Sequence, residues 1–253
     1  MADLSIIVLA AGQGTRMNAD HPKVLIKLNS QTLIQNLLEN IKQAGYSDSV
    51  SIVVGFQGQE VINLLGSKYN YVWQKEQLGT GHAVQQCQKF LQGKFKDHLI
   101  LYGDVPFISA QTIQKIINLH QQEESALSML TFKISNFKDN YQSYYHFGRI
   151  IRDQQEEVIK IVEFKDASEE EKKIRELNPA IYCVQDQWLW ENLKKLNKQN
   201  QQAEYYLTDL IKLASEQGLK INSLVIEDGF EFMGVNTLED LELAQKICKE
   251  LGK

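Results

Sequence analysis

Residues 4–17 read LSIIVLAAGQGTRM, and this stretch decides the fold class. Its first seven residues, Leu4 to Ala10, are nearly all apolar, as in a strand of a parallel sheet that is covered on both faces. A loop with two closely spaced glycines, Gly12 and Gly14, follows at once. Glycines let the backbone approach a ligand, and successive amides form a concavity that binds anions. The stretch therefore predicts a buried strand that ends in an anion-binding loop.

Two common phosphate-binding motifs do not fit this loop. A dinucleotide fingerprint requires a third glycine where the chain has Met17, and a Walker A loop requires Gly-Lys-Ser/Thr, which is absent. A plain strand-to-loop turn remains the alternative for an isolated pair of glycines. Two cations favour phosphate binding: Arg16 offers a fork suited to phosphate oxygens, and Pro22 stiffens the segment that presents Lys23.

The rest of the chain extends this strand into an α/β domain. Strand-like runs at 49–55, 71–73 and 98–102 alternate with helical patterns at about 30–44, 59–65, 81–91 and after Ser109. This alternation is the βαβ signature of an open sheet. Residues about 126–184 contain mainly strand-like runs and predict a small antiparallel substrate lobe; a helix at 205–217, a strand at 220–226 and a helix at 238–251 follow. We expect a single domain, 1–253, with a Rossmann-like mixed, mostly parallel sheet flanked by helices.

Composition narrows the class of partner. The net charge of −5 argues against a broad surface for nucleic acid or membrane. The first apolar run is too short to span a bilayer and follows Asp3 rather than a basic leader. The three cysteines are widely spaced and form no C-x-x-C pair, which indicates buried or free thiols in a reducing compartment. We expect a cytoplasmic protein that holds anions by a few local cations and backbone amides.

Residues 73–83, WQKEQLGTGHA, offer groups for a nucleotide. The amides of Gln74 and Gln77 can pair with the edge of a pyrimidine. The turn at Gly79 and Thr80 opens a helix, which places backbone amides and a hydroxyl near phosphate or ribose. The alternative is a helix start with Thr80 as its cap.

A second strand ends in a carboxylate. Residues 101–106 read LYGDVP, so Tyr102 and Asp104 lie at the end of an apolar strand. Ligands of open α/β sheets bind beyond the carboxyl ends of the strands, and a carboxylate there suits Mg²⁺, which takes one or two protein oxygens together with phosphates. A simple turn aspartate is the alternative.

The segments LAAGQGTRM, HPKVL, QLGTGHAV and LYGDVPF resemble, in this order and spacing, the pyrophosphorylase domain of the bacterial N-acetylglucosamine-1-phosphate uridyltransferases (GlmU). FGRIIRD, VEFKDAS, AEYYLTDLI and GVNT extend the resemblance over almost the whole chain. The resemblance implies a nucleotide-diphospho-sugar transferase fold. It also implies a Mg²⁺-dependent enzyme that joins UTP to a sugar 1-phosphate and releases pyrophosphate.

The resemblance assigns roles to matching positions. It implies that uridine is held by Ala10, Ala11, Gly12, Gln74, Gly79 and Thr80, with Gly14, Gln77 and Tyr102 as further substrate contacts. Arg16 and Lys23 would be the catalytic cations, and Asp104 and Asn236 would hold Mg²⁺. Gly148, Glu163 and Tyr205 would frame the sugar phosphate, with Asn178 as a further sugar contact. The family reaction needs no nucleophilic side chain, so we interpret His21 and His82 as structural or peripheral.

The chain departs from the family at one turn. Where the family reads Asn-Thr-Gly, this chain reads Asn178-Pro179-Ala180, which removes an amide and adds a methyl group in the expected sugar pocket. A different sugar 1-phosphate, another base, or a non-catalytic module that binds nucleotide sugars therefore remain alternatives. Bifunctional members also carry a C-terminal left-handed β-helix acetyltransferase. We find no hexapeptide repeat in these residues and expect neither that domain nor its activity. The oligomeric state is left open.

Overall fold

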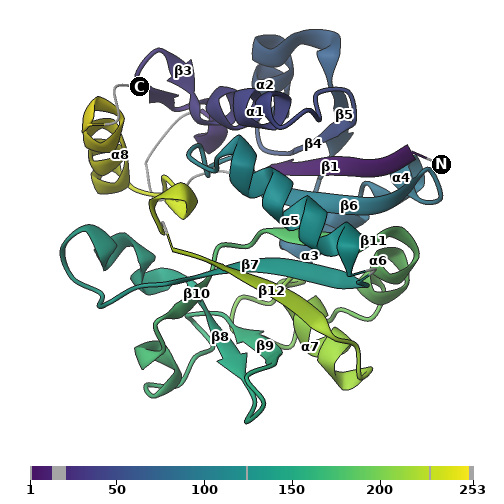
Figure 1. Cartoon of the computed structure of the whole chain (residues 1–253). Coiled ribbons are helices and arrows are strands. Elements are labelled where there is room, and N and C mark those ends of the chain that lie inside the picture. The colour runs from purple at the N-terminus through teal and green to yellow at the C-terminus, as the bar shows by residue number, and fades with distance from the viewer. Residues whose placement is uncertain (1, 13–20, 124, 228, 251–253) are drawn as a thin grey trace.

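Strand β1 (Ala2–Ala10) lies at the centre of the parallel half of the sheet (Figure 1). The computed structural model describes residues 2–12, 21–123, 125–227 and 229–250. β1 pairs in parallel with β4 (Val50–Val54) on one side and with β6 (Phe95–Tyr102) on the other. Its side chains alternate between two hydrophobic clusters: Ile6 and Val8 join one, and Ile7 joins the other. Because both faces are covered, the strand is apolar along nearly its whole length.

The sheet changes character across its width. Its order is β5-β4-β1-β6-β11-β7-β10-β8-β9, with β12 parallel to β7. The strands from β5 to β6 are parallel, and those from β11 to β9 pair antiparallel. The expected mixed α/β sheet is confirmed, and the strands between 126 and 184 continue this same sheet. The remaining strands are β5 (Asn70–Trp73), β7 (Leu127–Lys133), β8 (Gly148–Arg152), β9 (Val158–Val162), β10 (Glu176–Asn178), β11 (Tyr182–Gln185), β12 (Ile221–Ile226) and the separate hairpin β2 (Lys27–Leu28) and β3 (Gln31–Thr32).

Helices pack against both faces of the sheet. Helices α1, α5 and α8 contribute to the cluster that contains Ile6, and α3, α6 and α7 contribute to the cluster that contains Ile7. α1 begins with a capping box between Thr32 and Gln35, and Ser109 caps the start of α5 by accepting a hydrogen bond from the backbone of Thr112. The helices are α1 (Leu33–Gln43), α2 (Gly58–Leu65), α3 (Thr80–Gln85), α4 (Gln88–Leu91), α5 (Ala110–Gln122), α6 (Asp186–Leu193), α7 (Asp209–Glu216) and α8 (Leu238–Glu250), with 3₁₀ turns η2 (Lys23–Leu25), η3 (Gly66–Lys68), η4 (Asp139–His146), η5 (Glu171–Lys173) and η6 (Gly229–Phe232).

Three element predictions differ from the structure, and one helix was not predicted. The helix expected at 81–91 is divided into α3 and α4, and the helix expected at 205–217 begins only at Asp209. Among the strand-like runs expected between 126 and 184, the run Glu176–Val184 forms two strands, because Pro179 and Ala180 form a turn between β10 and β11. Sequence patterns did not reveal helix α6, whose apolar residues, including Trp188 and Trp190, lie directly after a strand.

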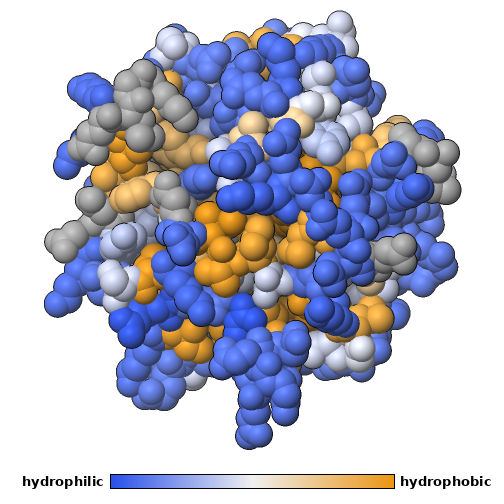
Figure 2. Space-filling model, viewed as in Figure 1, coloured by the Kyte–Doolittle hydropathy of each residue, from blue (hydrophilic) through white to orange (hydrophobic). Residues whose placement is uncertain are grey.

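The polarity of the surface and the burial of the cysteines agree with what the composition predicts. All three cysteines are free and buried. Hydrophilic residues dominate the face in Figure 2, and hydrophobic atoms are visible between them near its centre. Within the described ranges, no helix combines the length and apolarity that a bilayer crossing requires.

A buried polar network ties the paired central strands β1 and β6 to α6. The His98 ring lies 2.6 Å from the Ser5 hydroxyl and 2.8 Å from the Asp186 carboxylate, which also accepts hydrogen bonds from Trp190 and the backbone of Gly93. Ser5 and His98 are fully buried, so this Ser–His–Asp arrangement joins β1, β6 and α6 rather than meeting a substrate. Burial lowers the pKa of His98, and the hydrogen bond to Asp186 opposes that shift only in part.

This network predicts a pH dependence of stability. Below the ordinary pKa of about 6.5, the unfolded chain binds a proton at position 98 that the folded chain resists, so the free energy of unfolding falls as pH falls. In urea titrations, we expect the wild type to lose stability between pH 7.5 and pH 5.5, and His98→Gln to lose less. Equal pH slopes for the two proteins would contradict this assignment.

Candidate active site

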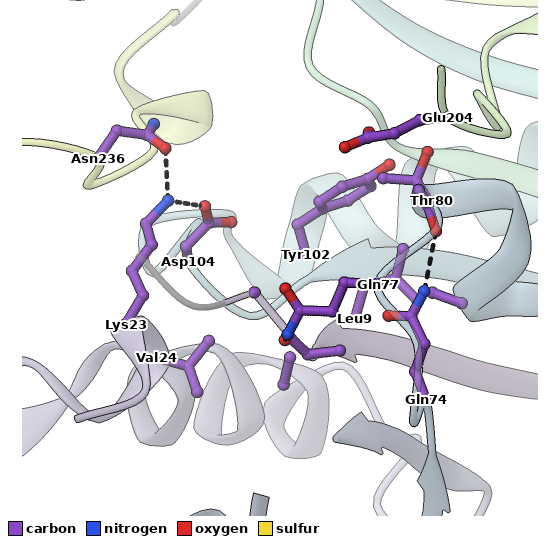
Figure 3. A pocket seen from close by; sticks show the side chains of 15 residues that line it. Leu9, Lys23, Val24, Gln74, Gln77, Thr80, Tyr102, Asp104, Glu204 and Asn236 are labelled. Carbon is purple, nitrogen blue, oxygen red and sulfur yellow. Dashed lines mark hydrogen bonds and ion pairs between the residues drawn. The ribbon is translucent and has the colours of Figure 1, made fainter. Parts of the chain in front are cut away.

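Three distant segments meet at the Lys23 ammonium group (Figure 3). Its Nζ donates hydrogen bonds to the Asp104 carboxylate and to the Asn236 amide oxygen. The side chains of Lys23 and Asp104 are only 11% and 22% exposed. An ion pair with little solvent around it is screened less than one on the surface. Two oxygen ligands therefore converge on one position that holds a cation.

Local structure explains why these side chains meet. Pro22 precedes the 3₁₀ turn η2, whose first residue is Lys23, and Val24 anchors the turn in the core. Asp104 follows β6, and its carbonyl accepts a hydrogen bond from the backbone of Val235. Asn236 is held at the start of α8, because the Asp240 carboxylate accepts its backbone N–H at 2.9 Å.

Two adjoining cavities open at this position, with volumes of about 300 Å³ and about 290 Å³. The first lies at the carboxyl ends of the parallel strands, and the second lies beside the antiparallel strands. They share the side chains at their junction, which are Thr80, Tyr102, Asp104, Glu204 and Asn236. A molecule with two parts joined by phosphates would fit across such a junction.

Two amide side chains and a glycine with a positive φ shape the first cavity. Gln74 donates from Nε2 to the Gly79 carbonyl at 3.0 Å, and Gln77 donates to the Ala11 carbonyl at 2.8 Å. Gly79 has φ +104°, and a Cβ there would lie 2.7 Å from the Tyr205 carbonyl oxygen. Only glycine therefore fits at position 79.

The second cavity contains a carboxyl group that is mostly enclosed by protein. Glu163 accepts a hydrogen bond from the Thr208 hydroxyl at 3.0 Å. Burial raises the pKa of Glu163, and the bond to Thr208 opposes this only in part. Nearby, the Asn178 oxygen accepts hydrogen bonds from the Ala180 backbone and the Tyr182 hydroxyl, which leaves its NH₂ group for other partners. Ala180 has φ +60°, a conformation that is unfavourable for alanine.

A model of the MobA-like NTP transferase domain matches residues 6–206. The chain belongs to this family. The match covers β1, both cavities' central strands and the segment that carries Glu204, so the NTP transferase domain contains most of the site described above.

Curated relatives agree with this family and with the resemblance found in the sequence. Bifunctional protein GlmU of Acetivibrio thermocellus is 39% identical over 249 residues, which cover 98% of this chain and 52% of the relative. The protein of the same name from Clostridium botulinum is 41% identical over 246 residues, covering 96% and 52%. The chain thus spans about half the length of the curated relatives it matches.

Solved structures show the same fold at low identity. A UDP-glucose pyrophosphorylase complexed with UDP-glucose superposes with a TM-score of 0.75 and 18% identity, covering 99% of this chain and 100% of that one. A CMP:2-keto-3-deoxy-manno-octonic acid synthetase complexed with CTP gives 0.72 and 16%, covering 99% and 100%. At such identities the likeness establishes the fold alone.

Most predicted site residues of this NTP transferase domain lie together. Gly14 and Arg16 lie outside the described residues. Tyr205 lines neither cavity: its ring stacks on His82, whereas the adjacent Tyr206 lines the second cavity. The predicted residues that line the first cavity are Ala10, Ala11, Gly12, Lys23, Gln74, Gln77, Gly79, Thr80, Tyr102, Asp104 and Asn236, and those added by the second are Gly148, Glu163 and Asn178.

Sequence reasoning missed several lining residues. Glu204 and Thr208 belong to the quoted segment AEYYLTDLI, so the segment was found but its inward side chains were not. His146 and Phe147 precede β8; Phe147 opens the quoted segment FGRIIRD, but neither side chain was assigned to the site. Half-buried Tyr102, which the sequence did identify, lies at the junction, and desolvation raises the pKa of its phenol.

The raised pKa of Glu163 predicts that the variant Glu163→Gln is more stable than the wild type. Because its folded-state pKa is raised, the carboxyl group lowers stability above about pH 4.5, and this cost grows until pH reaches the folded-state pKa and is constant beyond it. Glu163→Gln keeps an oxygen that accepts from Thr208 and removes the charge. We expect the variant to unfold at higher urea concentration than wild type at pH 7.5, by a margin that shrinks toward pH 4.5.

The matched control is Glu191→Gln, the same change at an exposed position on α6. We expect it to leave the urea midpoint nearly unchanged. A Glu163→Gln protein that is less stable than wild type at pH 7.5 would show that the carboxylate is stabilising, contrary to this interpretation.

Proposed function

We propose that the chain transfers UMP from UTP to N-acetylglucosamine 1-phosphate and releases pyrophosphate. The observation that carries this proposal is the contact of Lys23 with Asp104 and Asn236 at the junction of the two cavities. Membership of an NTP transferase family and the GlmU relatives support it. UTP would occupy the first cavity, with its base beside Gln74, and the sugar would occupy the second, beside Glu163 and Asn178.

The residues at the junction fit a divalent cation. The carboxylate of Asp104 and the amide oxygen of Asn236 are hard ligands of the kind that Mg²⁺ prefers, and the Lys23 ammonium group already occupies a cation position between them. We propose that these two residues hold Mg²⁺ in the working enzyme. When bound, Mg²⁺ would supply charge neutralisation for the phosphates.

The reaction we propose is a single in-line displacement. A phosphate oxygen of the sugar phosphate attacks the α-phosphorus of UTP, and the bond from that phosphorus to pyrophosphate breaks. Lys23 binds phosphate oxygens as a point charge, and the two cavities align the reactants, so positioning and neutralisation carry the catalysis. A phosphate monoester is ionised near neutral pH, so the attacking oxygen needs no general base.

The test is a substrate panel with pyrophosphate release as the readout. UTP, CTP, GTP and dTTP would each be combined with several sugar 1-phosphates and MgCl₂. We expect UTP with N-acetylglucosamine 1-phosphate to give the highest kcat/KM. Binding of UTP without pyrophosphate release for any sugar would instead support a non-catalytic binding module.

A different sugar 1-phosphate is the second candidate. Ala180 lines the second cavity and holds a left-handed conformation, so its methyl group alters the pocket at a turn where the family has glycine. A higher kcat/KM with another sugar phosphate in the same panel would select this alternative.

Asp104 provides the sharpest test of the junction. Asp104→Asn keeps the size of the side chain and removes the charge that pairs with Lys23. We expect kcat to fall about 10²-fold, as for removal of a preorganised charged group, and the Mg²⁺ concentration for half-maximal activity to rise. The control is Asp48→Asn, an exposed aspartate that lines neither cavity. Near-normal turnover of Asp104→Asn at low Mg²⁺ would contradict the metal assignment.

A further inference from the structure

The amide of Gln74 has only one orientation that satisfies its neighbours. Gln74 is 4% exposed, and its Nε2 lies 3.0 Å from the Gly79 carbonyl oxygen and 3.1 Å from Nδ1 of His82. An amide nitrogen carries two hydrogens, so these two contacts use both. Reversing the amide would place its oxygen against the Gly79 oxygen. The Gln74 oxygen is therefore the atom left for a ligand, and Figure 3 shows it turned toward the side of the cavity where Gln77 lies.

His82 completes this arrangement only in one form. To accept from Gln74, Nδ1 of His82 must carry no hydrogen, so the hydrogen of the neutral ring is on Nε2. Nε2 of Gln86 lies 3.0 Å from that ring nitrogen and 3.3 Å from the His82 carbonyl oxygen. Turning the Gln86 amide over gives up the longer contact and lets the Gln86 oxygen accept the ring hydrogen. The ring stacks on Tyr205, with centroids 6.4 Å apart, and Lys198 lies 4.9 Å from the Tyr205 ring on which His82 stacks.

The charges around His82 favour the neutral ring. Burial lowers the pKa of His82, and the positive charge of Lys198 lowers it further. A hydrogen bond to the Glu76 backbone and, to a smaller extent, the Glu76 charge raise the pKa of His82 without reversing the shift. The acceptor form that Gln74 requires is therefore the form present near neutral pH.

We propose that His82 is a positioning residue that makes the site select uracil over cytosine, by fixing the Gln74 amide with its oxygen toward the base. This rests on the proposed transfer of UMP. The uracil N3–H is a donor and pairs with the Gln74 oxygen, whereas N3 of cytosine is an acceptor and meets it with a lone pair. Turning the amide over to suit cytosine would break its bonds to both Gly79 and His82. Thymine also carries an N3–H, so the device separates uracil and thymine from cytosine. His82 thus has a role in specificity, where its sequence position alone indicated a peripheral residue.

The experiment compares the preference for UTP over CTP among variants at position 82. His82→Phe keeps a ring to stack on Tyr205 and removes the acceptor, whereas His82→Asn offers an amide oxygen near the place of Nδ1. We expect His82→Phe to lower the ratio of kcat/KM for UTP to that for CTP by about 10-fold, mainly through KM, since one of two hydrogen bonds that orient Gln74 is lost. His82→Asn should restore most of the ratio. Gln85→Leu, on the same helix but lining neither cavity, should leave it unchanged.

Two outcomes would overturn the inference. One is a His82→Phe protein with the wild-type ratio and a normal melting temperature; the other is an equal loss of the ratio in Gln85→Leu, which would indicate a general disturbance of α3. If His82→Phe does not fold, His82→Ala serves in its place. Calorimetric binding of UTP and CTP gives the same comparison without turnover, so absence of UMP transfer would count against the proposed function and not against the role of His82.

Discussion

The site depends on one constraint: a carboxylate, an amide oxygen and an ammonium group from three distant segments must share one small volume. Lys23 and Asp104 are 81 positions apart in sequence, and Lys23 and Asn236 are 213 apart. Lys23 comes from η2, Asp104 follows β6, and Asn236 lies before the start of α8. Under the proposed function, a chain with a net charge of −5 would attract two phosphate-bearing substrates by such local placement of cations. The same contact marks the place where the two cavities join.

The sequence was most informative where one physical cause determined the pattern. The nearly continuous apolar run from Leu4 to Ala10 required a strand covered on both faces, and β1 is such a strand. The Ser109 cap predicted the start of α5, because an unpaired helix amide needs an acceptor there. Once β1 and β6 are parallel neighbours, the residues after them, including Asp104, must lie at the same edge.

Side-chain direction outside regular elements was much harder to predict. Tyr205 and Tyr206 are adjacent in a segment without helix or strand, so no periodicity tells which ring enters the cavity. The break of Glu176–Val184 into two strands depends on Ala180 adopting a left-handed conformation, which local preference disfavours. The network of His82, Gln74 and Gly79 involves distances between side chains on a loop and a short helix, and only coordinates reveal which amide atom is left free. Sequence located the segments of the site, and the structure supplied the orientations.

The most direct test of the central claim is the stereochemistry of transfer. In the proposed reaction, the sugar phosphate attacks UTP in one step beside the position that Lys23 holds. UTP with a chiral α-phosphorothioate would be converted with N-acetylglucosamine 1-phosphate, and the configuration of the product read by ³¹P NMR. One in-line displacement gives inversion at phosphorus. Retention would require two displacements through a covalent enzyme intermediate and would contradict the account.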